Sequence, residues 1–148
     1  MNKPILLSLV AFLLLIGNAS QSSNAQVKAK KSTDTSRNPA LIERGNYIVE
    51  NVAMGERCHT PRDVNGNPER SNWLKGGPIQ LTQTYPTPIW ATREPRIAGS
   101  PPGTDEEFII LMTTGISRTG APPNPPMPPF RMTRQDAEAV LAYLKSLR

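Results

Sequence analysis

Cysteine and histidine are scarce in this sequence of 148 residues, which holds one of each. A single cysteine excludes an internal disulfide, and one cysteine with one histidine falls short of the four protein ligands of a structural zinc site. Aromatic residues make up only 5% of the chain, whereas prolines number 16. This composition is poor in material for an apolar core, so we expect a large flat cofactor to help fill the centre.

Strong charge of either sign is also missing, since the formal net charge is +5. A mild basic excess favours acidic partners or an anionic surface. The densest basic cluster, Lys28, Lys30 and Lys31, lies in a segment almost without apolar residues. The basic residues are too dispersed to indicate a nucleic-acid-binding protein.

The first 25 residues have the features of a secretory signal peptide. Lys3 gives the positive start, residues 4–16 form the apolar run, and cleavage is expected after Ala25, with Ala19 as a second option. The alternative is a membrane anchor that is not cleaved, but the run is shorter than the roughly 20 apolar residues of a spanning helix. We therefore expect an exported, periplasmic chain with no stable membrane span after cleavage. Residues 26–37 are hydrophilic and are expected to form a disordered tail.

Three segments show helical periodicity with capping residues. The first starts at Asn38 and Pro39. Its apolar stripe comprises Leu41, Ile42, Gly45, Ile48, Val49 and Val52. Gly45 weakens a helix by roughly 1 kcal/mol relative to alanine. Either a second helix crosses closely at Gly45, or the glycine is simply tolerated.

The second and third helical segments lie in the C-terminal half of the chain. Thr104 and Glu107 form a capping box before the apolar residues 108–112, and Gly115 suits the end of that helix. The apolar residues surround this helix, which favours its burial on more than one face. The last helix is expected from Thr133 to about Leu147, with a buried stripe of Ala137, Val140, Leu141 and Leu144.

Between the helices the chain is rich in proline, with twelve prolines in residues 78–129. Each proline removes a backbone donor, so we expect long loops and no strand in this region. Residues 120–129 form a stiff loop that carries Met127. Taken alone, this loop is better explained as a polyproline surface segment on which Met127 is incidental.

Cys58 and His59 are neighbours and match the second half of the Cys-x-x-Cys-His motif that attaches c-type haem. In that motif the cysteine sulfur bonds to a haem vinyl group, and the histidine ligates the iron. Gly55 stands where the first cysteine would be. Two adjacent residues alone are weak evidence, so the interpretation depends on the sequence around them.

Several stretches together resemble bacterial monohaem class I c-type cytochromes over residues 39–148. The similar stretches are residues 44–50, 52–54, 58–63, 73–78, 104–108, 113–115, 125–128 and 136–147. The resemblance implies an all-α, small cytochrome c-like domain at 38–148, with three main helices and long proline-rich loops around one haem c.

The resemblance also implies roles for individual residues. Cys58 would form the thioether to haem, His59 would be the proximal iron ligand, and Met127 would be the distal ligand. Met132 follows the same loop and remains an alternative. The protein would be an electron carrier or an electron-transfer subunit, not an enzyme, with periplasmic redox proteins or a dehydrogenase or oxidase as partners.

Because of Gly55, three outcomes stay open: a single thioether through Cys58, haem held only by its axial ligands, or a haem-free binding or subunit-interaction module. A cysteine nucleophile is disfavoured, since the chain has no second histidine to act as its base. Arg57, Arg62 and Lys75 are candidates for a positive docking rim, although ordinary solvated charge explains them equally well.

Overall fold

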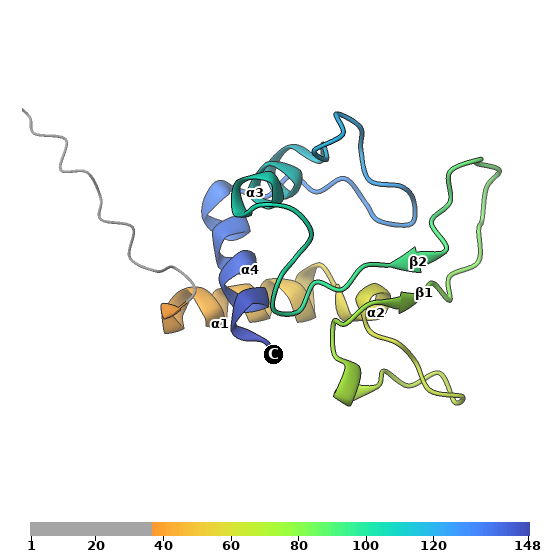
Figure 1. The fold of residues 1–148 in the computed structure, drawn as a ribbon, viewed down its shortest axis with the longest axis horizontal. Coiled ribbons are helices and arrows are strands. Elements are labelled where there is room, and N and C mark those ends of the chain that lie inside the picture. Colours follow the sequence, from red (N-terminus) through yellow and green to blue (C-terminus); the bar gives the residue numbers. More distant parts are fainter. Residues whose placement is uncertain (1–36) are drawn as a thin grey trace, which may run out of the picture. The chain divides into compact units, whose positions relative to one another are not determined.

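The computed structural model describes residues 37–148, in which helices are the main regular elements and are joined by long loops (Figure 1). Its α-helices are α1 (Pro39–Tyr47), α2 (Glu56–His59), α3 (Asp105–Thr114) and α4 (Arg134–Ser146). Helix α4 packs against both α1 and α3 and is the centre of the core. This arrangement fits the expected all-α fold.

The predicted signal peptide at 1–25 lies outside the described residues, as does the predicted tail at 26–37 except for Arg37. Both therefore stay predictions. Over residues 37–148, no helix combines the length and apolar character needed to cross a bilayer.

Local capping signals place the helix starts where the sequence predicts them. At α1, Asn38 Oδ1 accepts a hydrogen bond from the Ala40 amide at 3.1 Å, and Pro39 is the first helical residue. At α4, Thr133 Oγ1 accepts from the Asp136 amide at 3.1 Å. These bonds satisfy amides that have no partner within their own helix.

Helix α3 is capped at both ends as expected. Glu107 Oε2 accepts from the Thr104 amide at 2.7 Å, and Thr104 Oγ1 accepts from the Glu107 amide at 3.2 Å. Gly115 ends the helix with a left-handed φ of 67°. Phe108, Ile109 and Met112 are buried, but Ile110 is 43% exposed, so one face of α3 still meets solvent.

Gly45 marks the point where α1 and α4 cross. A Cβ built at Gly45 would overlap the main-chain carbonyl of Ala139 and lie 2.7 Å from Cβ of Tyr143. The predicted close helix crossing is therefore confirmed. The predicted stripe of α4 is also confirmed, and burial extends beyond it to Ala139, Ala142 and Tyr143 because α1 and α3 cover different faces.

Beyond Tyr47 the helix widens into a π-helical segment, Ile48–Val52, in which the Ala53 amide donates to the carbonyl of Ile48 at 2.7 Å. Ile48 and Val49 are buried as predicted, but Val52 is 58% exposed. The assignment of Val52 to the buried stripe was wrong. A π-helical turn holds more residues than an α-helical turn, so it rotates the positions that follow out of the α-helical stripe.

The proline-rich region contains one short strand pair, contrary to the expectation of no strand. β1 (Gly77–Pro78) pairs antiparallel with β2 (Arg93–Glu94), with Gly77 opposite Glu94 and Pro78 opposite Arg93. Both strands are edges of a two-stranded sheet, so Pro78 needs no second neighbour. The pair fixes Glu94 and Pro95 next to the segment that follows α2.

Candidate functional site

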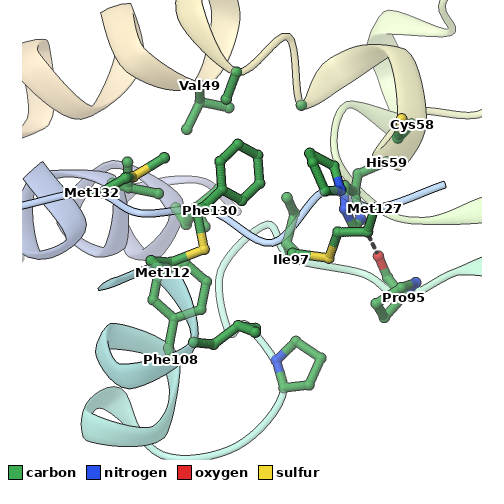
Figure 2. A pocket seen from close by; sticks show the side chains of 17 residues that line it. Val49, Cys58, His59, Pro95, Ile97, Phe108, Met112, Met127, Phe130 and Met132 are labelled. Carbon is green, nitrogen blue, oxygen red and sulfur yellow. Dashed lines mark hydrogen bonds between the residues drawn. The ribbon is translucent and has the colours of Figure 1, made fainter. Parts of the chain in front are cut away.

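An apolar cavity of about 240 Å³ lies between the helices and the loop that carries Met127 (Figure 2). Val49 comes from the π-helical segment, Phe108 and Met112 from α3, and Val140 and Leu144 from α4. All lining side chains are hydrocarbon or thioether in character except those of Cys58 and His59. Such a cavity suits a large apolar group that contains one metal ion, which the histidine nitrogen can bind.

His59 is the last residue of α2 and is held by its ring as well as by its backbone. Its Nδ1 lies 2.9 Å from the Pro95 carbonyl oxygen. Because a carbonyl only accepts, Nδ1 must be the protonated nitrogen, which leaves the lone pair on Nε2. A partner of this kind on the second nitrogen is typical of histidines that ligate metals.

Burial keeps the His59 ring neutral. His59 is only 8% exposed to solvent. Desolvation lowers the pKa of His59 below its usual value, and the bond to Pro95 opposes this shift only in part. A neutral imidazole is the form that binds a metal ion, so the ring needs no deprotonation first.

The backbone around His59 is fixed from both sides. The His59 amide donates to the Gly55 carbonyl at 2.8 Å, and the His59 carbonyl accepts from the Gly76 amide at 2.8 Å. Thr60 Oγ1 accepts from the buried Leu74 amide at 3.0 Å. These bonds join α2 to the segment before β1 and so set the position of the ring.

Cys58 lines the same cavity, and its surroundings disfavour a thiolate. Burial raises the pKa of Cys58, the carboxylates of Glu94 and Glu56 raise it further, and Arg62 and Arg57 partly oppose them. A nucleophilic cysteine needs a lowered pKa. The site therefore does not suit a cysteine enzyme, and the thiol stays in its protonated form at neutral pH.

Gly55 also lines the cavity and occupies a backbone conformation open to any residue, with φ −61° and ψ −26°. A Cβ at this position would lie 3.4 Å from Cγ1 of Val49, an ordinary van der Waals distance. The Gly55 amide donates to the Val49 carbonyl at 2.8 Å. The backbone at this position is thus compatible with a cysteine side chain.

Three methionines lie on the cavity wall: Met112, Met127 and Met132. In Figure 2, Met127 lies on the side of His59, whereas Met112 and Met132 lie toward Phe130. The Met127 loop is tied to the 79–92 hairpin, since the Ala91 amide donates to the Pro125 carbonyl at 2.8 Å. Met54 is 43% exposed and is not part of the wall.

Sequence reasoning missed the contributions of Pro95 and Glu94. Pro95 acts through its main-chain carbonyl, and nothing in a sequence marks one carbonyl among many. Glu94 is buried although glutamate is rarely so without a partner. Only its place in the strand pair reveals its burial, and the proline-rich sequence predicts no strand there.

Comparison with known proteins agrees with this geometry. A family model described as "Cytochrome c" matches residues 57–148, which include Cys58, His59 and Met127. A stretch of 36 residues is 50% identical to a protein named "Diheme cytochrome c-type" from Cereibacter sphaeroides. That stretch is 24% of this chain but only 12% of the relative.

The donor set in the cavity, one neutral imidazole with methionine thioethers in an apolar wall, fits a haem iron. The cofactor of cytochrome c domains is haem c, and one haem per chain accords with the single domain. With more than half of its residues matched, this chain belongs to the cytochrome c family.

Proposed function

We propose that this chain is an electron-transfer protein in which His59 and Met127 are the axial ligands of the haem iron and Cys58 forms a single thioether. The observation that carries the proposal is the bond from His59 to the Pro95 carbonyl, which leaves Nε2 as a free ligand on the wall of an apolar cavity. When bound, the haem supplies a one-electron redox centre.

The chain's own residues would bind and orient the haem and would exclude water from it. His59 and Met127 offer one nitrogen and one sulfur donor, a pair that raises the reduction potential of haem. Phe108, Phe130 and Ile97 line the cavity with apolar surface. An apolar environment is one of the protein's means of tuning the potential of a redox centre.

The proposed partners are periplasmic redox proteins, or a dehydrogenase or oxidase for which this chain is the electron-transfer subunit. Export by the signal peptide at 1–25 belongs to the same proposal. Arg57, Arg62 and Lys75 remain the proposed docking rim; Arg62 donates to the Gly66 carbonyl at 2.7 Å and Lys75 to the Ser71 carbonyl at 2.7 Å. These partners are uncharged, so both side chains keep charge for steering an acidic surface.

The central test uses the full chain expressed in a host that matures c-type cytochromes. The intact mass of the exported protein is measured before and after acid-acetone extraction. A mass raised by one haem that survives extraction supports the thioether at Cys58. Haem that is seen by absorbance but lost on extraction would mean that axial ligands alone hold it, and absence of haem in both measurements would leave a haem-free module.

Replacing Met127 with alanine tests the distal ligand. We expect Met127→Ala to lose the sulfur-to-iron charge-transfer band and to lower the reduction potential while the haem stays bound, because His59 and the proposed thioether at Cys58 still hold it. Met132→Ala is the matched control, since Met132 lies on the same cavity wall. Loss of the band in Met132→Ala, with its retention in Met127→Ala, would transfer the role to Met132.

Replacing Gly55 with cysteine tests the attachment stretch. We expect Gly55→Cys to raise the yield of extraction-resistant haem protein several-fold, because the backbone accepts a Cβ there and a second sulfur completes the motif. Gly55→Ser is the control for the added side chain alone. An equal rise in Gly55→Ser would show that helix stabilisation, rather than a second thioether, limits the yield.

A further inference from the structure

A second and much smaller cavity shares Cys58 with the apolar one. Glu94 is one of the residues that line this second cavity. Glu94 is only 9% exposed, and its Oε1 is shielded from solvent with no hydrogen-bond partner among the described residues. A buried polar atom without a partner is costly, so its presence calls for an explanation.

The strand pair holds Glu94 firmly in this place. Glu94 is opposite Gly77 in the sheet, and its neighbour Pro95 accepts the hydrogen bond from His59. Arg93 and Pro95 are exposed, whereas Glu94 is buried, as expected for alternating directions along a strand. The carboxyl group therefore sits on a rigid element that also positions the proposed iron ligand.

The groups around Glu94 leave its carboxylate poorly compensated. The ionisable residues near Glu94 are Glu56, Arg57 and Cys58 on α2 and Arg62 in the segment that follows α2. The residues of the second cavity that come from β1 and the segment up to Leu81 carry no ionisable group. No ion pair joins either arginine to Glu94 within residues 37–148. Burial raises the pKa of Glu94 to about 6.

Glu94 also acts electrostatically on the attachment residue. Its negative charge is the largest charge effect on Cys58, ahead of that of Glu56, and it raises the pKa of the thiol. Charges interact more strongly in a buried region than in water. A charge that reaches Cys58 will also reach a redox centre attached to Cys58.

We propose that Glu94 is a redox-linked proton site: its carboxylate takes up one proton from water when the haem site gains one electron from a redox partner, and returns that proton to water on oxidation. This inference rests on the proposed haem function. The incoming electron adds negative charge near a carboxylate, which favours the carboxylic acid form. By linkage, protonation of Glu94 favours the reduced state by the same amount.

The expected consequence is a reduction potential that falls as pH rises through about pH 5–7, because deprotonation adds a negative charge beside the redox centre. Glu94→Gln, which is neutral at every pH, should have a potential that is higher at neutral pH and flat across this range. A tenfold difference in proton affinity between the two redox states corresponds to about 59 mV for a one-electron couple.

The test is a redox titration of the haem-loaded chain at a series of pH values, for wild type, Glu94→Gln and Glu43→Gln. Glu43 is an exposed glutamate on α1, so its replacement makes the same change of charge away from the cavity. We expect Glu43→Gln to follow the wild type. A slope that persists in Glu94→Gln, or a flat wild-type potential, would overturn the inference.

A second measurement needs no variant. The side-chain carboxyl carbon of Glu94 is followed by NMR against pH in the wild-type chain, haem-free, reduced and oxidised. We expect a midpoint above 4.5 in the haem-free chain and a higher midpoint in the reduced than in the oxidised form. Equal midpoints in the two redox states would refute the linkage, whereas failure to bind haem at all would refute the proposed function instead.

Discussion

Replacing His59 with alanine is expected to leave the purified chain almost without haem. The ring supplies the nitrogen ligand that would hold the haem in place while the thioether at Cys58 forms, and the chain has no second histidine to take its place. Removing a residue that hydrogen-bonds to a metal ligand typically lowers metal affinity by roughly 10–100-fold. Removing the ligand itself should lower the affinity for the haem iron further. Haem per chain is measured by absorbance and intact mass after purification from a host that matures c-type cytochromes.

Imidazole provides the matched control for this variant. Removal of the ring leaves a space on the cavity wall, and added imidazole can occupy it and offer the same nitrogen. Partial recovery of haem in His59→Ala with imidazole, and no effect of imidazole on the haem content of wild type, would identify ligation as the missing function. Undiminished haem in His59→Ala without imidazole would rule out His59 as the ligand that retains it.

Replacing Gly45 with alanine is expected to destabilise the fold by about 2 kcal/mol, the upper end of the overpacking cost less the gain in helix propensity. The new Cβ would overlap the Ala139 carbonyl, which is main chain and cannot rotate away. Overpacking costs typically about 1–3 kcal/mol and occasionally more, and the gain in helix propensity returns only about 1 kcal/mol. The helices must therefore separate, which also loosens the packing of α4, whose Val140 and Leu144 line the cavity.

Urea unfolding of the haem-free chain, monitored by circular dichroism, measures this effect. Glu43→Ala is the control, because Glu43 lies on the exposed face of α1, where alanine meets no neighbouring helix and alters the helix propensity only slightly. We expect Glu43→Ala to change the free energy of unfolding by no more than about 0.5 kcal/mol. A Gly45→Ala chain as stable as the control would show that α1 and α4 can move apart at little cost.

The features that the sequence predicts well are those that depend on neighbouring residues. The caps at Asn38, Thr104 and Thr133 are bonds over two or three positions, and all are present. The close crossing at Gly45 was one of the two alternatives that the sequence left open, and the structure shows it. The Cys58 and His59 pair identified the cavity because both residues are unique in the chain.

The features that escape prediction depend on contacts between distant segments. The bond from His59 to Pro95 spans 36 positions. The exposure of Val52 follows from a π-helical turn, a rare variation that the α-helical period does not encode. Burial of Glu94 requires the strand pair that brings residues 77 and 94 together, and a proline in β1 argued against any strand.

The conformation at Gly55 has an evolutionary consequence. Codons for glycine and cysteine can differ by a single base, and the backbone here has ordinary helical angles with room for a side chain. One point mutation can therefore change the number of cysteines in the attachment stretch without any rearrangement of α2. Lineages of this domain can gain or lose a second cysteine in either direction while the scaffold stays the same.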